Sequence, residues 1–129
     1  MYILIRTIEN EEMKKRRGFT GADWWFDPIG NLHIMIAEEI SDPKYQKALA
    51  IHEMTEALHC ELLGITTKQV DDFDEAFEKL HPENHGLNAG DAPGCPYAVP
   101  HSLATAPERV YAACAGICWS EYDEEIGSL

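Results

Sequence analysis

The sequence predicts a single α+β domain over residues 1–129, in which a small N-terminal sheet packs on one buried helix and two or three further helices complete the fold. Three observations predict this fold class. The chain has 129 residues, and 45% of them are hydrophobic, which is enough apolar material for one packed core. Residues 1–40 carry strand and turn signals. Helical periodicity begins near Asp42.

The sheet is expected to be an antiparallel β-hairpin or a three-stranded antiparallel sheet. Residues 2–8 alternate loosely and are rich in β-branched side chains, which predicts a strand. A short charged helix is expected over residues 10–17, with an asparagine as its N-cap. The apolar runs 23–27 and 32–36 lie on either side of an Asp-Pro-Ile-Gly-Asn turn, and this pattern predicts a hairpin.

Two helices are expected after the sheet. Asp42 can cap a helix in which Pro43 takes the first position, and Gly64 is the next plausible stop. A second helix is expected over residues 67–80, where apolar side chains recur on one side and acidic side chains occupy the other. The first of these helices is the one that we expect to pack on the sheet.

The remainder of the chain combines an irregular loop with further helix. Residues 81–100 contain four of the seven prolines, so we expect a long loop that borders the functional site. A helix is expected over residues 102–115, although Pro107 requires either a start near Thr105 or a kink. One or two helical turns should follow Ser120.

The charge balance excludes several classes of partner. The chain carries 10 Lys plus Arg against 23 Asp plus Glu, a formal net charge of −13. Nucleic acid and anionic membranes both require a clustered basic face, so we expect neither as a partner. The basic run over residues 14–17 is interpreted as a solvated helix face. No apolar run is long enough for a membrane span or a signal peptide, and the cysteines form no CxxC pair, so we expect a cytoplasmic protein.

Side chains that can bind a metal share one side of the helix that begins at Pro43. At 100° per residue, His52, Glu56 and His59 fall within one narrow stripe. The helix should be largely buried, and a buried imidazole or carboxylate must be hydrogen-bonded, paired or bound to a metal. A histidine nitrogen and a carboxylate oxygen one turn apart can reach a common point about 2 Å from each. The spacing therefore predicts a divalent metal site.

The segment His52-Glu53-x-x-Glu56, preceded by a strand and a short connector, resembles the zincin metallopeptidases, in which a strand leads into a helix that carries HExxH. It also resembles a group of small uncharacterised phage and prophage proteins, which have an HExxE helix followed later by a Pro-Tyr pair, a histidine and a Glu-Arg pair. In this chain the later segment would be Pro96-Tyr97, His101 and Glu108-Arg109. These resemblances imply a zincin-like metal-binding domain, peptidase-like hydrolysis and the cytoplasm of a bacterium or phage host. The sequence departs from the zincin pattern at Glu56, where a second histidine is expected.

The resemblance implies a role for each matching residue. His52 matches the first metal ligand, Glu53 matches the general base that activates water, and Glu56 takes the position of the second ligand. His101 is the best candidate for the third ligand, because it enters a helix that would bring Glu108 to the same side. The alternative ligands, or residues beside the ion, are His59, His81, His85, Asp91 and Glu108.

We expect one divalent transition metal as the cofactor. Zinc is the first choice, and manganese, iron or nickel are alternatives, because a mixed site of histidine and carboxylate accepts all of them. A carboxylate in place of an imidazole lowers the positive charge of the site and makes bound water less acidic, which works against hydrolysis at neutral pH. Metal-dependent hydrolysis and metal binding without catalysis both stay open at this point.

Three other functions fit parts of the sequence. The first is a non-catalytic phage or prophage protein for interaction or regulation, with a structural metal or a buried polar network. The second is a di-iron carboxylate protein, suggested by Glu56-x-x-His59 and Glu78-x-x-His81. The third is a magnesium-dependent nucleoside triphosphate pyrophosphohydrolase, to which Glu53-x-x-Glu56 and Asp71-x-x-Asp74 are similar. A water-accessible ion beside Glu53 would favour the hydrolase, and a closed four-ligand site would favour the structural role.

Overall fold

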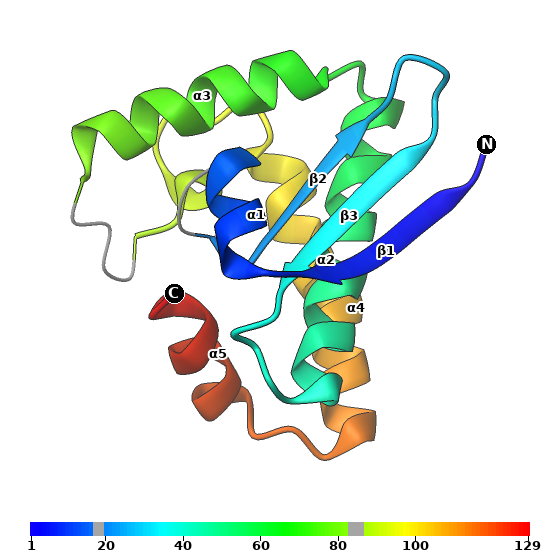
Figure 1. Ribbon diagram of the computed structural model, residues 1–129, viewed down its shortest axis with the longest axis vertical. Helices are drawn as coiled ribbons and strands as arrows, with labels where there is room; N and C mark the ends of the chain where they lie inside the picture. The colour runs from blue at the N-terminus through cyan, green and yellow to red at the C-terminus, as the bar shows by residue number, and fades with distance from the viewer. Residues whose placement is uncertain (17–19, 83–86) are drawn as a thin grey trace.

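The computed structural model describes residues 1–16, 20–82 and 87–129 of the chain (Figure 1). The fold is α+β, as predicted, with one three-stranded sheet and helices packed on both of its faces. In chain order the elements are β1 Ile3–Ile8, α1 Asn10–Arg16, β2 Ala22–Phe26, β3 Leu32–Ala37, α2 Pro43–Leu62, α3 Thr67–Leu80, the 3-10 turn η1 Ala89–Asp91, α4 Ala98–Ala115 and α5 Trp119–Gly127. The predicted end of the first helix, residue 17, lies outside the described residues.

The sheet is mixed, whereas the sequence predicted an antiparallel one. β2 and β3 form the expected antiparallel hairpin, and Gly30 adopts a φ of +88° in its turn. β1, however, runs parallel to β3, so the strand order is β1-β3-β2. The prediction of direction was wrong because side chains alternate in the same way in parallel and antiparallel strands. The connection through α1 and β2 returns the chain so that β3 runs beside β1 in the same direction.

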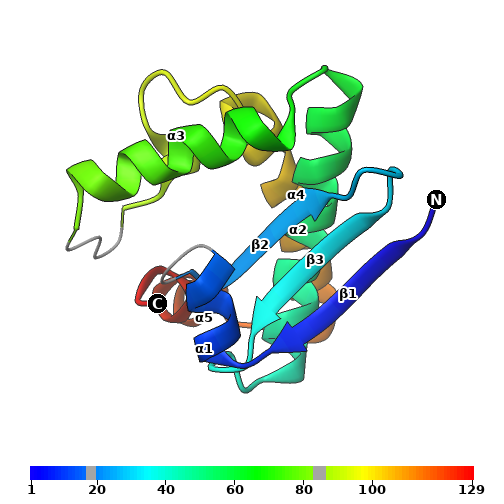
Figure 2. The same cartoon turned by 45° about the horizontal axis from the view of Figure 1, so that its top comes forward.

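The two faces of the sheet are covered by different helices (Figure 2). The face toward α2 is apolar, and its side chains form the main core with Leu49, Ala57 and Cys60 of that helix. The sheet residues of this core are Trp24, Leu32, Ile34 and Ile36. On the opposite face, Met13 of α1 packs in a smaller cluster with Ile8, Met35 and Ala37. The sheet therefore fixes the position of α2, the helix that carries the candidate site.

The boundaries predicted for the helices α2 and α3 are confirmed. The Asp42 side chain accepts a hydrogen bond of 2.8 Å from the backbone N–H of Lys44, and Pro43 opens α2. Gly64 adopts a φ of +73° just after the end of α2. Thr66 caps α3 in a reciprocal capping box with Gln69.

The helix α4 begins earlier than the sequence predicted. It starts at Ala98 and continues through Pro107 to Ala115, so the expected start at residue 102 or 105 was wrong. Pro100 lies in the first turn, where a backbone N–H has no partner within the helix, so the proline costs no hydrogen bond there. The consequence is that His101 belongs to the first turn of the helix.

None of the helices in the described part of the chain is long and apolar enough to cross a membrane.

Candidate metal centre

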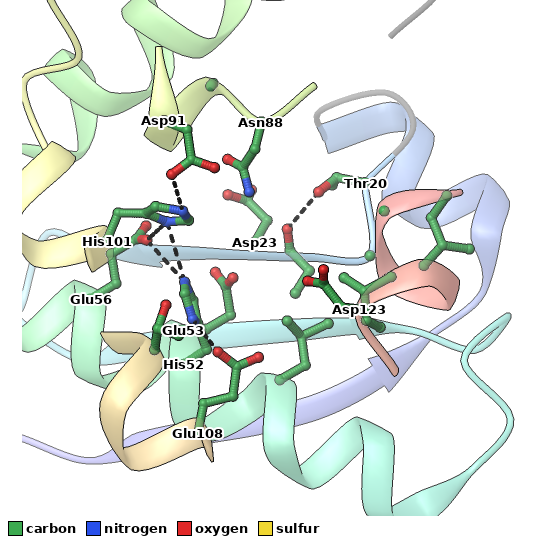
Figure 3. A pocket seen from close by; sticks show the side chains of 18 of the residues that line it. Thr20, Asp23, His52, Glu53, Glu56, Asn88, Asp91, His101, Glu108 and Asp123 are labelled. Atoms are coloured by element: carbon green, nitrogen blue, oxygen red, sulfur yellow. Dashed lines mark hydrogen bonds and ion pairs between the residues drawn. The ribbon is translucent and has the colours of Figure 1, made fainter. Parts of the chain in front are cut away.

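The candidate site lies between α2 and α4, which pack side by side along much of their lengths (Figure 1). His52 and Glu56 are one turn apart on α2, and His101 and Glu108 are two turns apart on α4. Figure 3 shows the four side chains turned toward one another across the helix interface. His52, Glu56 and Glu108 are buried, and the His101 side chain is 13% exposed.

Three of these side chains bring ligand atoms to one point. His52, Glu56 and His101 each offer one atom, and the three atoms lie within 4.8 Å of one another. Nδ1 of His101 is 2.8 Å from Oε2 of Glu56 and 3.3 Å from Nε2 of His52, and that Nε2 is 3.4 Å from the same Oε2. An ion about 2 Å from each donor in tetrahedral geometry needs donors roughly 3.3 Å apart. The triad can therefore hold a metal ion.

His52 is oriented by a chain of hydrogen bonds on the side away from the triad. Its Nδ1 lies 2.7 Å from Oε2 of Glu108, and the Tyr122 hydroxyl donates to the other oxygen of that carboxylate. A histidine that binds a metal usually donates its second ring N–H to a carboxylate, which fixes the tautomer and the ring orientation. The sequence analysis gave Glu108 as an alternative ligand or as a residue beside the ion, and the structure places its carboxylate against Nδ1 of His52.

The other two members of the triad also have outer partners. The indole Nε1 of Trp24 donates a hydrogen bond of 2.9 Å to Oε1 of Glu56, which leaves Oε2 directed at the triad. Asp91 of η1 places Oδ1 3.5 Å from Nε2 of His101. Gly90 packs so closely that an added Cβ would lie 2.5 Å from Cγ of His101. Each candidate ligand is thus held from behind, as in preorganised metal sites.

Hydrogen bonds decide the charges of the buried pair His52 and Glu56. Burial disfavours the charged form of His52, but the hydrogen bonds to Glu108 and Glu56 outweigh burial and raise its pKa to about 10. Burial also works to raise the pKa of Glu56, yet hydrogen bonds from His101 and His52 lower that pKa to about 2. A cation at the triad and a proton on His52 would therefore compete for the same place.

The triad opens into a cleft with a volume of about 830 Å³. Its walls come from the start of β2, from α2, α3, α4 and α5, and from residues 87–91. This size suits a small molecule or a short segment of polypeptide. The irregular loop therefore borders the site as expected, although residues 83–86 of that loop lie outside the described part of the chain.

Glu53 lines the same cleft and follows His52 directly in α2 (Figure 3). Its side chain is partly exposed, in contrast to the buried Glu56. The three ligand atoms of the candidate cluster do not include one from Glu53. Its expected role as a general base stays a prediction.

A second buried polar pair stands at the wall of the cleft. The Tyr97 hydroxyl donates a hydrogen bond of 2.5 Å to Oδ1 of Asp74, and both residues are buried. Burial and the Asp74 carboxylate raise the pKa of Tyr97 far above its ordinary value. Asp74 is one of the acidic residues that the sequence analysis placed on the side of α3 opposite its apolar residues, yet the structure buries it against Tyr97.

Two of the remaining candidate ligands, His59 and His81, are not part of the triad. His59 Nδ1 lies 2.7 Å from the backbone carbonyl of Thr55, within its own helix. His81 follows the end of α3, and its ring lies against Phe77. His85 lies outside the described residues.

Sequence reasoning missed Trp24 and Tyr122 as parts of the site, and it named Tyr97 without giving it a role. Nothing in the spacing of aromatic residues distinguishes a hydrogen-bond donor to a buried carboxylate from an ordinary core residue. The Pro-Tyr-x-x-x-His pattern did contain a usable signal, because Tyr97 precedes His101 by one helical turn.

Comparisons with protein-family models, with curated proteins and with solved structures find no match. The resemblance to zincins and to phage proteins therefore rests on the residues of this sequence. What the structure adds is the cluster of His52, Glu56 and His101, drawn from two helices.

Proposed function

We propose that this protein is a metal-dependent hydrolase in which His52, Glu56 and His101 bind one divalent ion. The observation that carries the proposal is the convergence of three ligand atoms at the wall of an open cleft. Catalytic metal sites typically use three protein ligands and leave a position for water or substrate, whereas structural sites close the shell with four. The arrangement thus supports a catalytic site over a purely structural one.

The donor set fits zinc best. Two imidazole nitrogens and one carboxylate oxygen are a common ligand set of catalytic zinc, and the carboxylate of Glu108 behind His52 completes the usual outer contact. Manganese, iron and nickel accept the same donors. The Glu56 carboxylate adds negative charge beside the ion, and this favours tight binding over strong acidification of water.

Glu53 is the residue that we assign as general base. A divalent ion in the triad would supply Lewis-acid activation of a water molecule. Glu56 and Glu108 are buried and hydrogen-bonded to His101 and His52, whereas the Glu53 side chain is partly exposed at the cleft. Glu53 borders the cleft next to His52 and can take the proton of an attacking water.

A polypeptide is the substrate class that the cleft suits. Residues 20–24 line it, and these include the first half of β2, which is an edge strand of the sheet. An edge strand can pair with an extended peptide through backbone hydrogen bonds. This placement supports the peptidase-like activity expected from the resemblance to zincins.

The test is hydrolysis of fluorescently labelled casein by the metal-loaded protein, compared with Glu53→Gln. We expect wild-type activity, its loss in Glu53→Gln by about 10²-fold or more, and unchanged metal content in that variant. Glu61→Gln is the matched control, because Glu61 is exposed on the same helix. If the wild type binds metal but does not hydrolyse casein, the protein is a non-catalytic interaction or regulatory protein and the hydrolase proposal is wrong. If Glu53→Gln keeps full activity, Glu53 is not the general base.

A further inference from the structure

The strand β1 forms one edge of the sheet and is exposed along most of its length (Figures 1 and 2). Its neighbour is β3, the element with which β1 makes its main contacts among the described residues. Ile3, Leu4 and Ile5 are 36%, 38% and 49% exposed, and the preceding Tyr2 is 61% exposed. An apolar strand edge of this kind is the part of a sheet to which another strand pairs most readily.

The backbone of β1 presents hydrogen-bonding groups outward at alternate residues. The carbonyls of Tyr2 and Ile8 accept hydrogen bonds from Leu32 and Glu38, so the even-numbered residues of β1 direct their backbone groups toward β3. Because this direction alternates along a strand, Ile3, Ile5 and Thr7 direct theirs away from the sheet. Among the described residues, these three form the outer backbone edge of the sheet.

Apart from the single charge of Arg6, the sequence of β1 lacks the features that normally keep an edge strand from pairing. Such features are prolines, charged side chains and bulges. Residues 3–8 contain no proline and no acidic residue, and Arg6 carries the only charge. The strand also pairs with β3 in an unbroken register from Ile3 to Ile8, without a bulge.

We propose that β1 pairs with β1 of a second copy of this chain, antiparallel, with the two-fold axis at Ile5. This register pairs Ile5 with itself and Ile3 with Thr7, so that the outward backbone groups of both strands meet. It places Arg6 opposite Leu4, and no like charges face each other across the pair. The two three-stranded sheets become one continuous sheet across the axis.

The edge of β1 is a surface on which two copies could meet without facing acidic residues, because residues 3–8 contain none. The formal net charge of −13 opposes the association of two copies, and this repulsion is strongest where acidic residues face each other across an interface. The first acidic residue is Glu9, which follows the strand, and β1 itself is positive. The strand edge is therefore a surface on which two copies can meet without acidic repulsion.

The pairing does not depend on the proposed hydrolase function. None of the residues of β1 belongs to the lining of the cleft, which begins at Thr20 among the described residues. Metal content and hydrolysis can be measured on the same samples, so either proposal can fail while the other stands.

The test is sedimentation equilibrium of the full chain at several protein concentrations. We expect a mass of twice the 14.5 kDa of one chain for the wild type and a single-chain mass for Ile5→Lys, which places two cations on the axis. Ile29→Lys is the matched control, because Ile29 is 84% exposed in the β2–β3 turn, and it should stay dimeric. A single-chain mass for the wild type, or a dimer of Ile5→Lys, would overturn the proposal.

Amide hydrogen exchange of the wild type gives a second readout that needs no variant. We expect the amides of Ile3, Ile5 and Thr7 to exchange more slowly as the protein concentration rises, on the order of tenfold or more. The amides of Leu4 and Arg6, which face β3, should be protected at every concentration. A dimer in which the outward amides exchange freely would place the interface elsewhere and refute the pairing.

Discussion

Gly90 lies so close to His101 that one added methyl group should disturb the metal centre. In Gly90→Ala the new Cβ would stand 2.5 Å from Cγ and 2.7 Å from Nδ1 of the imidazole. The ring or the loop must then move by roughly 1 Å to reach normal contact. Overpacking of this kind costs about 1–3 kcal/mol of unfolding free energy. Nδ1 is also the atom 2.8 Å from Glu56, so we expect metal affinity to fall by about tenfold or more.

Two assays separate these effects. Urea unfolding of the metal-free protein measures the loss of stability, and competition with a chromophoric chelator measures the affinity for zinc. Gly127→Ala is the control, because a Cβ there meets nothing within 4 Å, and both quantities should stay near the wild-type values. Wild-type zinc affinity in Gly90→Ala would refute the conclusion that η1 holds His101 in place.

Two further predictions concern stability. Tyr97→Phe removes a hydrogen bond to the buried Asp74 carboxylate and should cost about 1.5–3 kcal/mol of unfolding free energy. Tyr111→Phe is the control at a partly exposed site and should cost less than about 0.5 kcal/mol. Equal urea midpoints for the two variants would contradict this prediction. Hydrogen bonds from His33 and from backbone amides lower the pKa of Asp27 to about 2 from 3.8, so its contribution is present above pH 3.8 and is lost as the pH falls toward 2. The stability gap between wild type and Asp27→Asn should therefore shrink over that range in urea titrations, and a constant gap would disprove the assignment.

The sequence predicted the elements better than their arrangement. Local signals such as the Asp42-Pro43 start and the turn at Gly30 depend on neighbouring residues, and these boundaries were confirmed. The direction of β1 and the start of α4 depend on distant packing. Pro107 lies in the interior of α4, where local preferences disfavour a proline, and Pro100 lies in the first turn, so the start of this helix at Ala98 could not be inferred from local preferences.

The site was predicted in part because one of its helices carries a periodic motif. His52 and Glu56 followed from spacing on α2, and His101 followed from its expected helix. Whether Glu108 would act as a ligand or support His52 depends on how far apart α2 and α4 lie, and a single sequence does not contain that distance. The same holds for Trp24, whose indole reaches Glu56 from the sheet.

The central claim is that His52, Glu56 and His101 bind one divalent ion, and metal content tests it most directly. Mass spectrometry of protein purified without a metal-binding tag should find about one equivalent of a transition metal in the wild type, and loss of it in His52→Ala and His101→Ala. His59→Ala is the matched control, because His59 lies on the same helix but contacts Thr55, and this variant should keep the ion. No bound metal in the wild type, even after addition of zinc, manganese, iron and nickel, would contradict the account and leave the three residues as a buried polar network.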